Sequence, residues 1–382
     1  MTYILQAAGL VGASYFVLLS RRKLSFLILA IPLVWFIGVS VIYWRYGPIG
    51  QWAFYQNDQY FHWRVVNQLL VNEFNMTFDR LNFLRVPYTA PAFLLSVVGI
   101  DSTLALKYVS LICAMSSASM VEGVVRKANG RFLIRHIWIT ALPITVFFSL
   151  LALRETMMLM CVTHLFLGKS HPRRALSLLV LVILRPHLAA AIVFGLCWGW
   201  LFSRFQERWY LGFVLITAVL PIYLGTIGFS IGNYIIYQLP LQLYQELFLQ
   251  NQVIQIFSAF AGLQFLTVDV QTVEYTTRSL LFIRVLFPEI ILAPLVFSVS
   301  CFFLSPRTTR LKISVLATFV FFMAVSSGTE YLSVRQSLPL MPIMGVAALL
   351  SFSQIFQNDR TALTNSEITP LSTPPKEFVE RS

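Results

Sequence analysis

The chain has 382 residues, of which 57% are hydrophobic and only 12% are charged. Soluble domains devote about a quarter of their residues to Asp, Glu, Lys and Arg, so this composition excludes an ordinary water-facing surface. The net charge of +12 does not indicate nucleic-acid binding, because the basic residues come in short clusters between apolar runs. Such clusters are typical of loops on the cytoplasmic side of a membrane.

Apolar runs of a length suited to crossing a bilayer follow one another along the chain, and they predict an all-α fold, a polytopic bundle of transmembrane helices. The first run has neither the basic start nor the cleavage site of a secretory signal, so we expect a retained first helix with its N-terminus outside. The uninterrupted runs lie near 3–19, 24–44, 104–125, 132–152, 209–230, 286–304, 312–327 and 337–355, and interrupted runs lie at 156–168 and 175–203.

Two polar interruptions decide the predicted topology. Leu153-Arg154-Glu155 splits residues 132–168, and Arg185-Pro186-His187 splits residues 175–203. Each stretch is either a hairpin of short helices or one overlong helix. Hairpins place most Lys and Arg on the cytoplasmic side and give about eleven spans, with the N-terminus outside and the C-terminus in the cytoplasm. Single helices give about nine spans and move Lys169, Arg173 and Arg174 outside, so hairpins are favoured.

The predicted transmembrane helical domain covers residues 1–357, with outer loops at 45–103 and 231–285. Both loops mix aromatic residues with Gln, Asn and a few charges, and we expect helices in them that lie at the membrane interface. In the first loop the apolar face of such a helix comprises Trp52, Phe61, Trp63, Val66, Leu70 and Phe74. Residues 358–382 are rich in Thr, Ser and Pro, which predicts a disordered cytoplasmic tail.

Four polar clusters fall on the outer side in this topology. Ionisable groups in or near hydrocarbon are costly and indicate pairing or a water-filled cavity. The first cluster holds Asp58, Tyr60 and His62, in which Asp58 and His62 share one face of a helix. A carboxylate there suits a general base, while the alternative is a solvated face that merely positions the neighbouring aromatic residues.

The second cluster is Arg154 with Glu155, and the third is Arg185 with Pro186 and His187. A guanidinium in a dry cleft is suited to a phosphate or pyrophosphate, because its fork matches two oxygens. The alternatives are an arginine that extends to the interface, or an ion pair between Arg154 and Glu155.

The fourth cluster holds Glu330, Tyr331 and Arg335, shortly before the last apolar run. Lys and Arg that flank membrane spans occur mostly on the cytoplasmic side, whereas Arg335 falls on the outer side in this topology. Arg335 is therefore predicted to bind phosphate. Arg278 and Arg284 either supplement the site or lie among headgroups. The histidines His136, His164 and His171 and the four cysteines, all in or beside apolar runs, are interpreted as structural, with no disulfide and no metal site.

The order of these features resembles the GT-C superfamily of glycosyltransferases that use lipid-linked sugars, and the related polysaccharide polymerases of bacterial envelopes. The residues that carry the resemblance are Asn57-Asp58-Gln59-Tyr60, Leu153-Arg154-Glu155, Arg185-Pro186 and Arg335-Gln336-Ser337-Leu338-Pro339.

The resemblance implies a multi-pass enzyme of the bacterial cytoplasmic (inner) membrane that acts in cell-envelope or exopolysaccharide assembly. Its partners would be the lipid bilayer, a sugar donor linked to polyprenyl phosphate or diphosphate, and a glycan acceptor on the outer face. Asp58 would activate or orient the acceptor hydroxyl, and Arg154, Arg185 and Arg335 would hold the phosphate. No cofactor is expected: no second acid lies near Asp58 to complete a metal pair, although the resemblance leaves a divalent metal open.

Two alternatives stay open. A polymerase or ligase for O-antigen or exopolysaccharide would depend on outer arginines and aromatic residues more than on one acid. A transporter or flippase for a lipid-linked glycan would carry an inverted repeat and charges near the membrane midplane, and the sequence shows neither to inspection.

Overall fold

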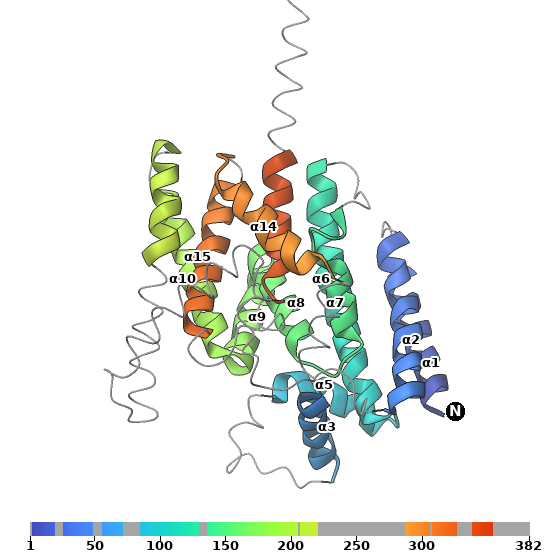
Figure 1. Ribbon diagram of the computed structural model, residues 1–382. Helices are drawn as coiled ribbons and strands as arrows, with labels where there is room; N and C mark the ends of the chain where they lie inside the picture. Colours follow the sequence, from blue (N-terminus) through green and yellow to red (C-terminus); the bar gives the residue numbers. More distant parts are fainter. Residues whose placement is uncertain are drawn as a thin grey trace, which may run out of the picture.

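The computed structural model describes residues 2–19, 26–48, 56–71, 85–129, 136–204, 207–220, 287–305, 308–326 and 338–353. All regular structure in these ranges is helical, which confirms the predicted all-α class (Figure 1). The predictions for the outer loop 231–285, for the tail 358–382 and for Glu330, Tyr331 and Arg335 fall outside the described residues.

Most helices coincide within a few residues with the predicted apolar runs. The labelled helices are α1 (Thr2–Leu19), α2 (Phe26–Tyr46), α3 (Gln56–Leu70), α5 (Val86–Val97), α6 (Ser102–Asn129), α7 (Leu142–Ser149), α8 (Glu155–Leu167), α9 (His171–Leu184), α10 (Pro186–Phe202), α14 (Glu289–Cys301) and α15 (Thr309–Ser326). Further apolar helices span Tyr210–Leu220 and Met341–Ser353. The run predicted at 132–152 is regular helix only in α7, because turns occupy the described residues before it.

Two helices in the described part of the chain are long and apolar enough to cross a membrane. They span Leu27–Tyr46 in α2 and Ser102–Lys127 in α6. Several shorter apolar helices found there, such as α8 and α10, have 10–17 residues.

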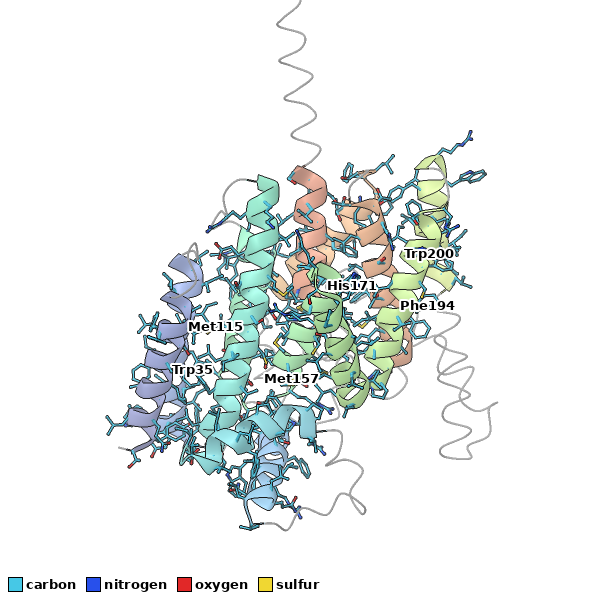
Figure 2. All side chains as sticks on the ribbon, turned by 180° about the vertical axis from the view of Figure 1, so that it is seen from behind. Trp35, Met115, Met157, His171, Phe194 and Trp200 are labelled. Carbon is cyan, nitrogen blue, oxygen red and sulfur yellow. The ribbon has the colours of Figure 1, made fainter. Side chains whose placement is uncertain are left out.

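Both predicted interruptions end a helix. Arg185 adopts φ −160° and ψ 82° between α9 and α10, and Pro186 is the first residue of α10. Proline is common at the first position of a helix for two reasons. It disfavours helical geometry in the residue before it, and its missing N–H would have no partner within the helix at that position. In Figure 2, His171 at the start of α9 and Trp200 near the end of α10 lie toward the same end of the molecule. Helices α9 and α10 therefore form a hairpin around Arg185.

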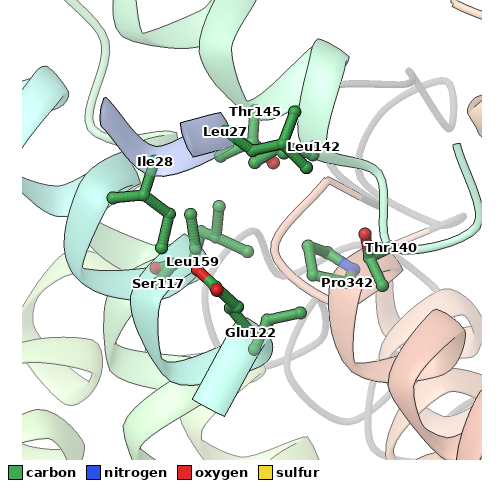
Figure 3. A pocket seen from close by; sticks show the side chains of 11 residues that line it. Leu27, Ile28, Ser117, Glu122, Thr140, Leu142, Thr145, Leu159 and Pro342 are labelled. Carbon is green, nitrogen blue, oxygen red and sulfur yellow. The ribbon is translucent and has the colours of Figure 1, made fainter. Parts of the chain in front are cut away.

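Several pairs of neighbouring helices run antiparallel. In each case a residue near the start of one helix contacts a residue near the end of its neighbour. The contacts that show this are Tyr3 stacked on Tyr43, Lys107 bonded to the Pro48 carbonyl, Phe202 edge-on to Tyr210, and Thr308 bonded to Ser351. At the other end of α2, Leu27 and Ile28 line a small cavity with Ser117 and Thr145 (Figure 3), which sets α2 beside both α6 and α7.

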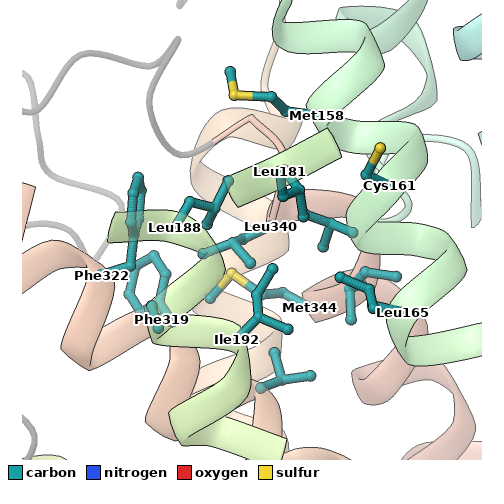
Figure 4. Packing of buried hydrophobic residues seen from close by; sticks show 14 of the residues in the cluster. Met158, Cys161, Leu165, Leu181, Leu188, Ile192, Phe319, Phe322, Leu340 and Met344 are labelled. Atoms are coloured by element: carbon teal, nitrogen blue, oxygen red, sulfur yellow. The ribbon is translucent and has the colours of Figure 1, made fainter. Parts of the chain in front are cut away.

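The largest group of buried apolar side chains lies between α8, α9, α10, α15 and the helix Met341–Ser353 (Figure 4). Within it α10 and α15 approach closely at two glycines. A Cβ atom at Gly195 would lie 2.5 Å from the carbonyl oxygen of Ser314, and one at Gly199 would lie 1.9 Å from the Ser314 hydroxyl. Small residues four apart are typical of helix pairs that pack inside membranes.

Candidate functional site

Helix α3 docks onto the irregular segment between α7 and α8 through two buried side chains. Gln59 Oε1 accepts a hydrogen bond from the backbone N–H of Ala152 at 3.2 Å, and His62 Nδ1 donates to the Ala152 carbonyl at 2.9 Å. Because α7 has ended, these backbone groups have no partner within a helix and would be costly to bury alone. The helix that carries Asp58 is therefore fixed beside Arg154 and Glu155.

Side chains from other helices bond to two further carbonyls of this break. Trp35 Nε1 donates to the Ser149 carbonyl at 2.9 Å, and Ser110 Oγ donates to the Leu153 carbonyl at 3.3 Å. The buried hydroxyl of Tyr88 lies 2.9 Å from Ser110 Oγ. Helices α2, α3, α5 and α6 thus hold the segment in place, which gives Arg154 a defined position.

The second and third predicted clusters lie together in the structure. Arg154 Nη1 donates to the carbonyl of Leu184 at 3.1 Å, and Leu184 is the last residue of α9. Arg185 follows directly, and its Nε donates to His187 Nε2 at 2.9 Å. We call Arg154, Arg185 and His187 the arginine junction. Arg154 and Leu184 are thirty residues apart in the chain, yet one hydrogen bond joins the break at Arg154 to the end of α9.

An aromatic ring from α15 covers one side of the arginine junction. The Arg185 guanidinium lies 5.4 Å from the centre of the Phe322 ring, and the His187 ring stacks on the same ring at 5.7 Å. A cation over an aromatic face is favoured, so the Phe322 ring helps to hold the Arg185 guanidinium in this position. The charges of both arginines act on His187, so positive charge is concentrated at this point.

The other predicted residues lie on the two neighbouring helices. Asp58 is half-buried in the first turn of α3, and Tyr60 is 45% exposed and tilted against Trp63. Glu155 is buried in the first turn of α8. Arg335 lies outside the described residues.

Helix α3 packs on the rest of the fold through Gln59, His62 and Val66, which are buried, because the polar pair supplies the partners that Ala152 requires. Of the apolar face predicted for a helix at the membrane interface, Phe61 is 44% exposed, Leu70 is 37% exposed and Val66 is fully buried. Trp52 and Phe74, which belong to the same predicted face, lie outside the described residues.

This arrangement is suited to binding a phosphate. A guanidinium carries five N–H donors in a fixed fork, whose geometry matches the oxygens of a phosphate, and Arg154 and Arg185 bring two such groups to one place in the fold. Both side chains are half-buried, where the dielectric constant is lower than in water and an anion binds more strongly. Across the ranges given above, His, Cys, Asp and Glu side chains form no group of three or more that could hold a metal ion.

The residues that position this site are mostly ones that the sequence did not single out. Tyr88, Ser110 and Phe322 are uncharged, and similar residues occur throughout the apolar runs. Gln59 and His62 are the exceptions, because they lie beside Asp58 in the first polar cluster.

Comparison with known proteins gives no relative: no family model matches the chain, no curated protein matches it, and no solved structure matches it.

Proposed function

We propose that the chain is an integral membrane glycosyltransferase of a bacterial cytoplasmic membrane. It transfers a sugar from a polyprenyl phosphate or diphosphate carrier to a glycan acceptor on the outer face, in cell-envelope or exopolysaccharide assembly. The observation that carries this proposal is the hydrogen bond from Arg154 to the Leu184 carbonyl, because it joins two arginine-bearing breaks into one anion site. The docking of α3 on Ala152 holds the helix of Asp58 against the segment that leads to Arg154.

The surface of the described helices supports a membrane location. Large apolar side chains stand out from α1 and α2, with Phe16 81% exposed and Trp44 84% exposed. Soluble monomers rarely expose such side chains over whole helices, whereas lipid tails accept them. The antiparallel helix pairs fit a chain that crosses a bilayer repeatedly. The number of about eleven crossings, with the N-terminus outside and the C-terminus in the cytoplasm, rests on the distribution of Lys and Arg along the sequence.

The depth of the arginine junction fits a lipid-linked substrate. Helices α8 and α9 have 13 and 14 residues. Helices of this size are about 20 Å long, whereas the hydrocarbon layer is about 30 Å thick. The arginine junction therefore lies below the outer surface, at a depth that a phosphate reaches while its polyprenyl chain remains in the lipid.

In the proposed reaction the acceptor hydroxyl oxygen attacks the anomeric carbon of the donor sugar. The bond between that carbon and the phosphate oxygen breaks, and the carrier phosphate leaves with the electron pair. Asp58 accepts the hydroxyl proton, and the guanidinium groups of Arg154 and Arg185 stabilise the charge that grows on the leaving oxygen. Phe322 and His187 hold Arg185 in its place.

The test compares sugar transfer by the wild type with transfer by Asp58→Asn, Arg154→Ala and Arg185→Ala in reconstituted membranes. Removing one donor to a developing oxyanion costs about 10²–10³ in rate, so each arginine variant is expected to lose that much. Arg204→Ala is the matched control, since Arg204 lies on Trp200 at the other end of α10 and should retain full activity. Arginine variants as active as this control would overturn the proposal.

The same set of variants separates the enzyme classes. If Asp58→Asn transfers sugar nearly as well as the wild type while the arginine variants are inactive, the chain is a polymerase or ligase of the same pathway. A deletion strain distinguishes a flippase: unextended glycan units accumulate outside when transfer is missing, and lipid-linked units stay inside when flipping is missing.

A further inference from the structure

A second polar site lies at the other end of the α8–α9 hairpin. A cavity of about 400 Å³ lies between α6, the end of α8 and the start of α9. We call it the basic cavity. Its polar lining consists of His164, Lys169, Arg173, Ser116, Ser119 and Ser170.

The described lining of the basic cavity is positive and rich in hydrogen-bond donors. Lys169 and Arg173 are exposed side chains, His164 lies close enough for its charge to interact with that of Arg173, and no Asp or Glu occurs among the described residues that line it. The nearby acid Glu122 lines the small cavity on the opposite face of α6 and pairs with Arg126. The described residues that line the basic cavity therefore carry a net positive charge.

The first turn of α9 adds to the positive potential in the basic cavity. Ser170 is the residue that precedes α9, and its hydroxyl makes no capping hydrogen bond to the helix. The free N–H groups of a helix start carry a partial positive charge and favour anions. With three serine hydroxyls and two long cationic side chains around one cavity, the chemistry matches a tetrahedral oxyanion with several acceptor oxygens.

The basic cavity is separate from the arginine junction. The thirteen residues of α8 span about 20 Å between the two, which is more than one phosphate or diphosphate group can bridge. Ser116 and Ser119 flank Ser117, and Ser117 shares the small cavity with Leu27 and Ile28 at the start of α2. The start of a membrane-crossing helix marks the headgroup level, so the basic cavity lies where phosphates of a lipid surface occur.

We propose that the basic cavity binds a phosphate group, held by Lys169 and Arg173 and by the serine hydroxyls. A phosphodiester headgroup of an anionic lipid and a free phosphate from the aqueous phase offer the same chemistry to this site. The proposal does not depend on the proposed transferase activity, since neither cation belongs to the arginine junction.

The experiment uses the full chain in nanodiscs of phosphatidylcholine and follows its thermal unfolding midpoint. One arm adds inorganic phosphate at constant ionic strength, balanced with chloride. The other arm replaces part of the phosphatidylcholine with phosphatidylglycerol. A ligand that binds only the folded state raises the midpoint in a saturable manner. If inorganic phosphate raises the unfolding midpoint, the ligand of the basic cavity is free phosphate. If only phosphatidylglycerol raises it, the ligand is a lipid headgroup.

The variants are Lys169→Gln and Arg173→Gln, with Arg174→Gln as the matched control. Arg174 is adjacent in the chain and carries the same charge, but it does not line the basic cavity. Each lining variant should weaken the apparent affinity about tenfold or more, because each removes a charge-assisted hydrogen bond. Both lining residues are exposed, so the fold should survive. No saturable rise in the wild type, or equal rises in the lining and control variants, would overturn the proposal.

Discussion

At the scale of single residues, the arginine junction depends on contacts between side chains and backbone carbonyls. The interrupted helices expose carbonyl oxygens at Ala152 and Leu184, and His62 and Arg154 take them as partners. The sequence singled out both of these side chains because polar residues in apolar runs are conspicuous. It could not show that Arg154 reaches α9, since every residue in the chain offers a carbonyl.

If Arg154 and Arg185 hold one phosphate, their contributions to binding should be coupled. We expect Arg154→Ala and Arg185→Ala each to weaken the binding of a polyprenyl diphosphate about tenfold to a hundredfold, as the loss of a charge-assisted hydrogen bond does. The double variant should weaken binding by less than the product of the two, because residues that share a partner are not additive.

Binding measured by titration of the purified variants gives this coupling directly. Arg204→Ala, which lies on Trp200 at the far end of α10, is the control and should bind as the wild type does. If the loss of binding free energy in the double variant equals the sum of the losses in the two single variants, the two arginines do not share one phosphate. That result would contradict a single site.

At the scale of elements, breaks in helices set the geometry of the site. Proline at the start of α10 predicts the break at Arg185, and the structure has it there. The break after α7 was also predicted, from Arg154 and Glu155, but the length of α7 was not. An apolar run does not show where its helix begins, because turns and helices in a bundle interior use the same residue types.

The contact between α10 and α15 makes a prediction about stability. Gly195→Ala should destabilise the chain by about 1–3 kcal/mol, because its Cβ would lie 2.5 Å from the Ser314 carbonyl oxygen, which belongs to the backbone. Gly123→Ala in α6 is the control, since no atom lies within 4 Å of its added Cβ.

The control should be neutral or more stable by up to about 1 kcal/mol, as alanine favours a helix over glycine. Thermal unfolding in one detergent measures both. Equal midpoints for the two variants would mean that α10 and α15 do not approach as closely as described.

At the scale of the whole molecule, the α8–α9 hairpin connects two positive sites at opposite ends. The arginine junction lies where α8 begins and α9 ends, and the basic cavity lies where α8 ends and α9 begins. Composition and the apolar runs were enough to predict the helical class. The gathering of distant polar clusters was a hypothesis from a resemblance, because no local pattern encodes which helices become neighbours.

The central claim is that Asp58 and the arginine junction face the outside of the cell while the basic cavity faces the cytoplasm. The sites of labelling are the exposed residues Tyr60, two positions after Asp58 on α3, and Lys169 in the basic cavity. Both are replaced singly by cysteine in a Cys197→Ser background, because Cys197 is the exposed native cysteine and Cys113, Cys161 and Cys301 are buried.

The measurement is the reaction of these variants with a membrane-impermeant maleimide, in intact spheroplasts and after lysis. We expect Tyr60→Cys to be labelled in intact spheroplasts and Lys169→Cys only after lysis. Labelling of both positions from the same side, or of Lys169→Cys alone from outside, would contradict an outward-facing arginine junction.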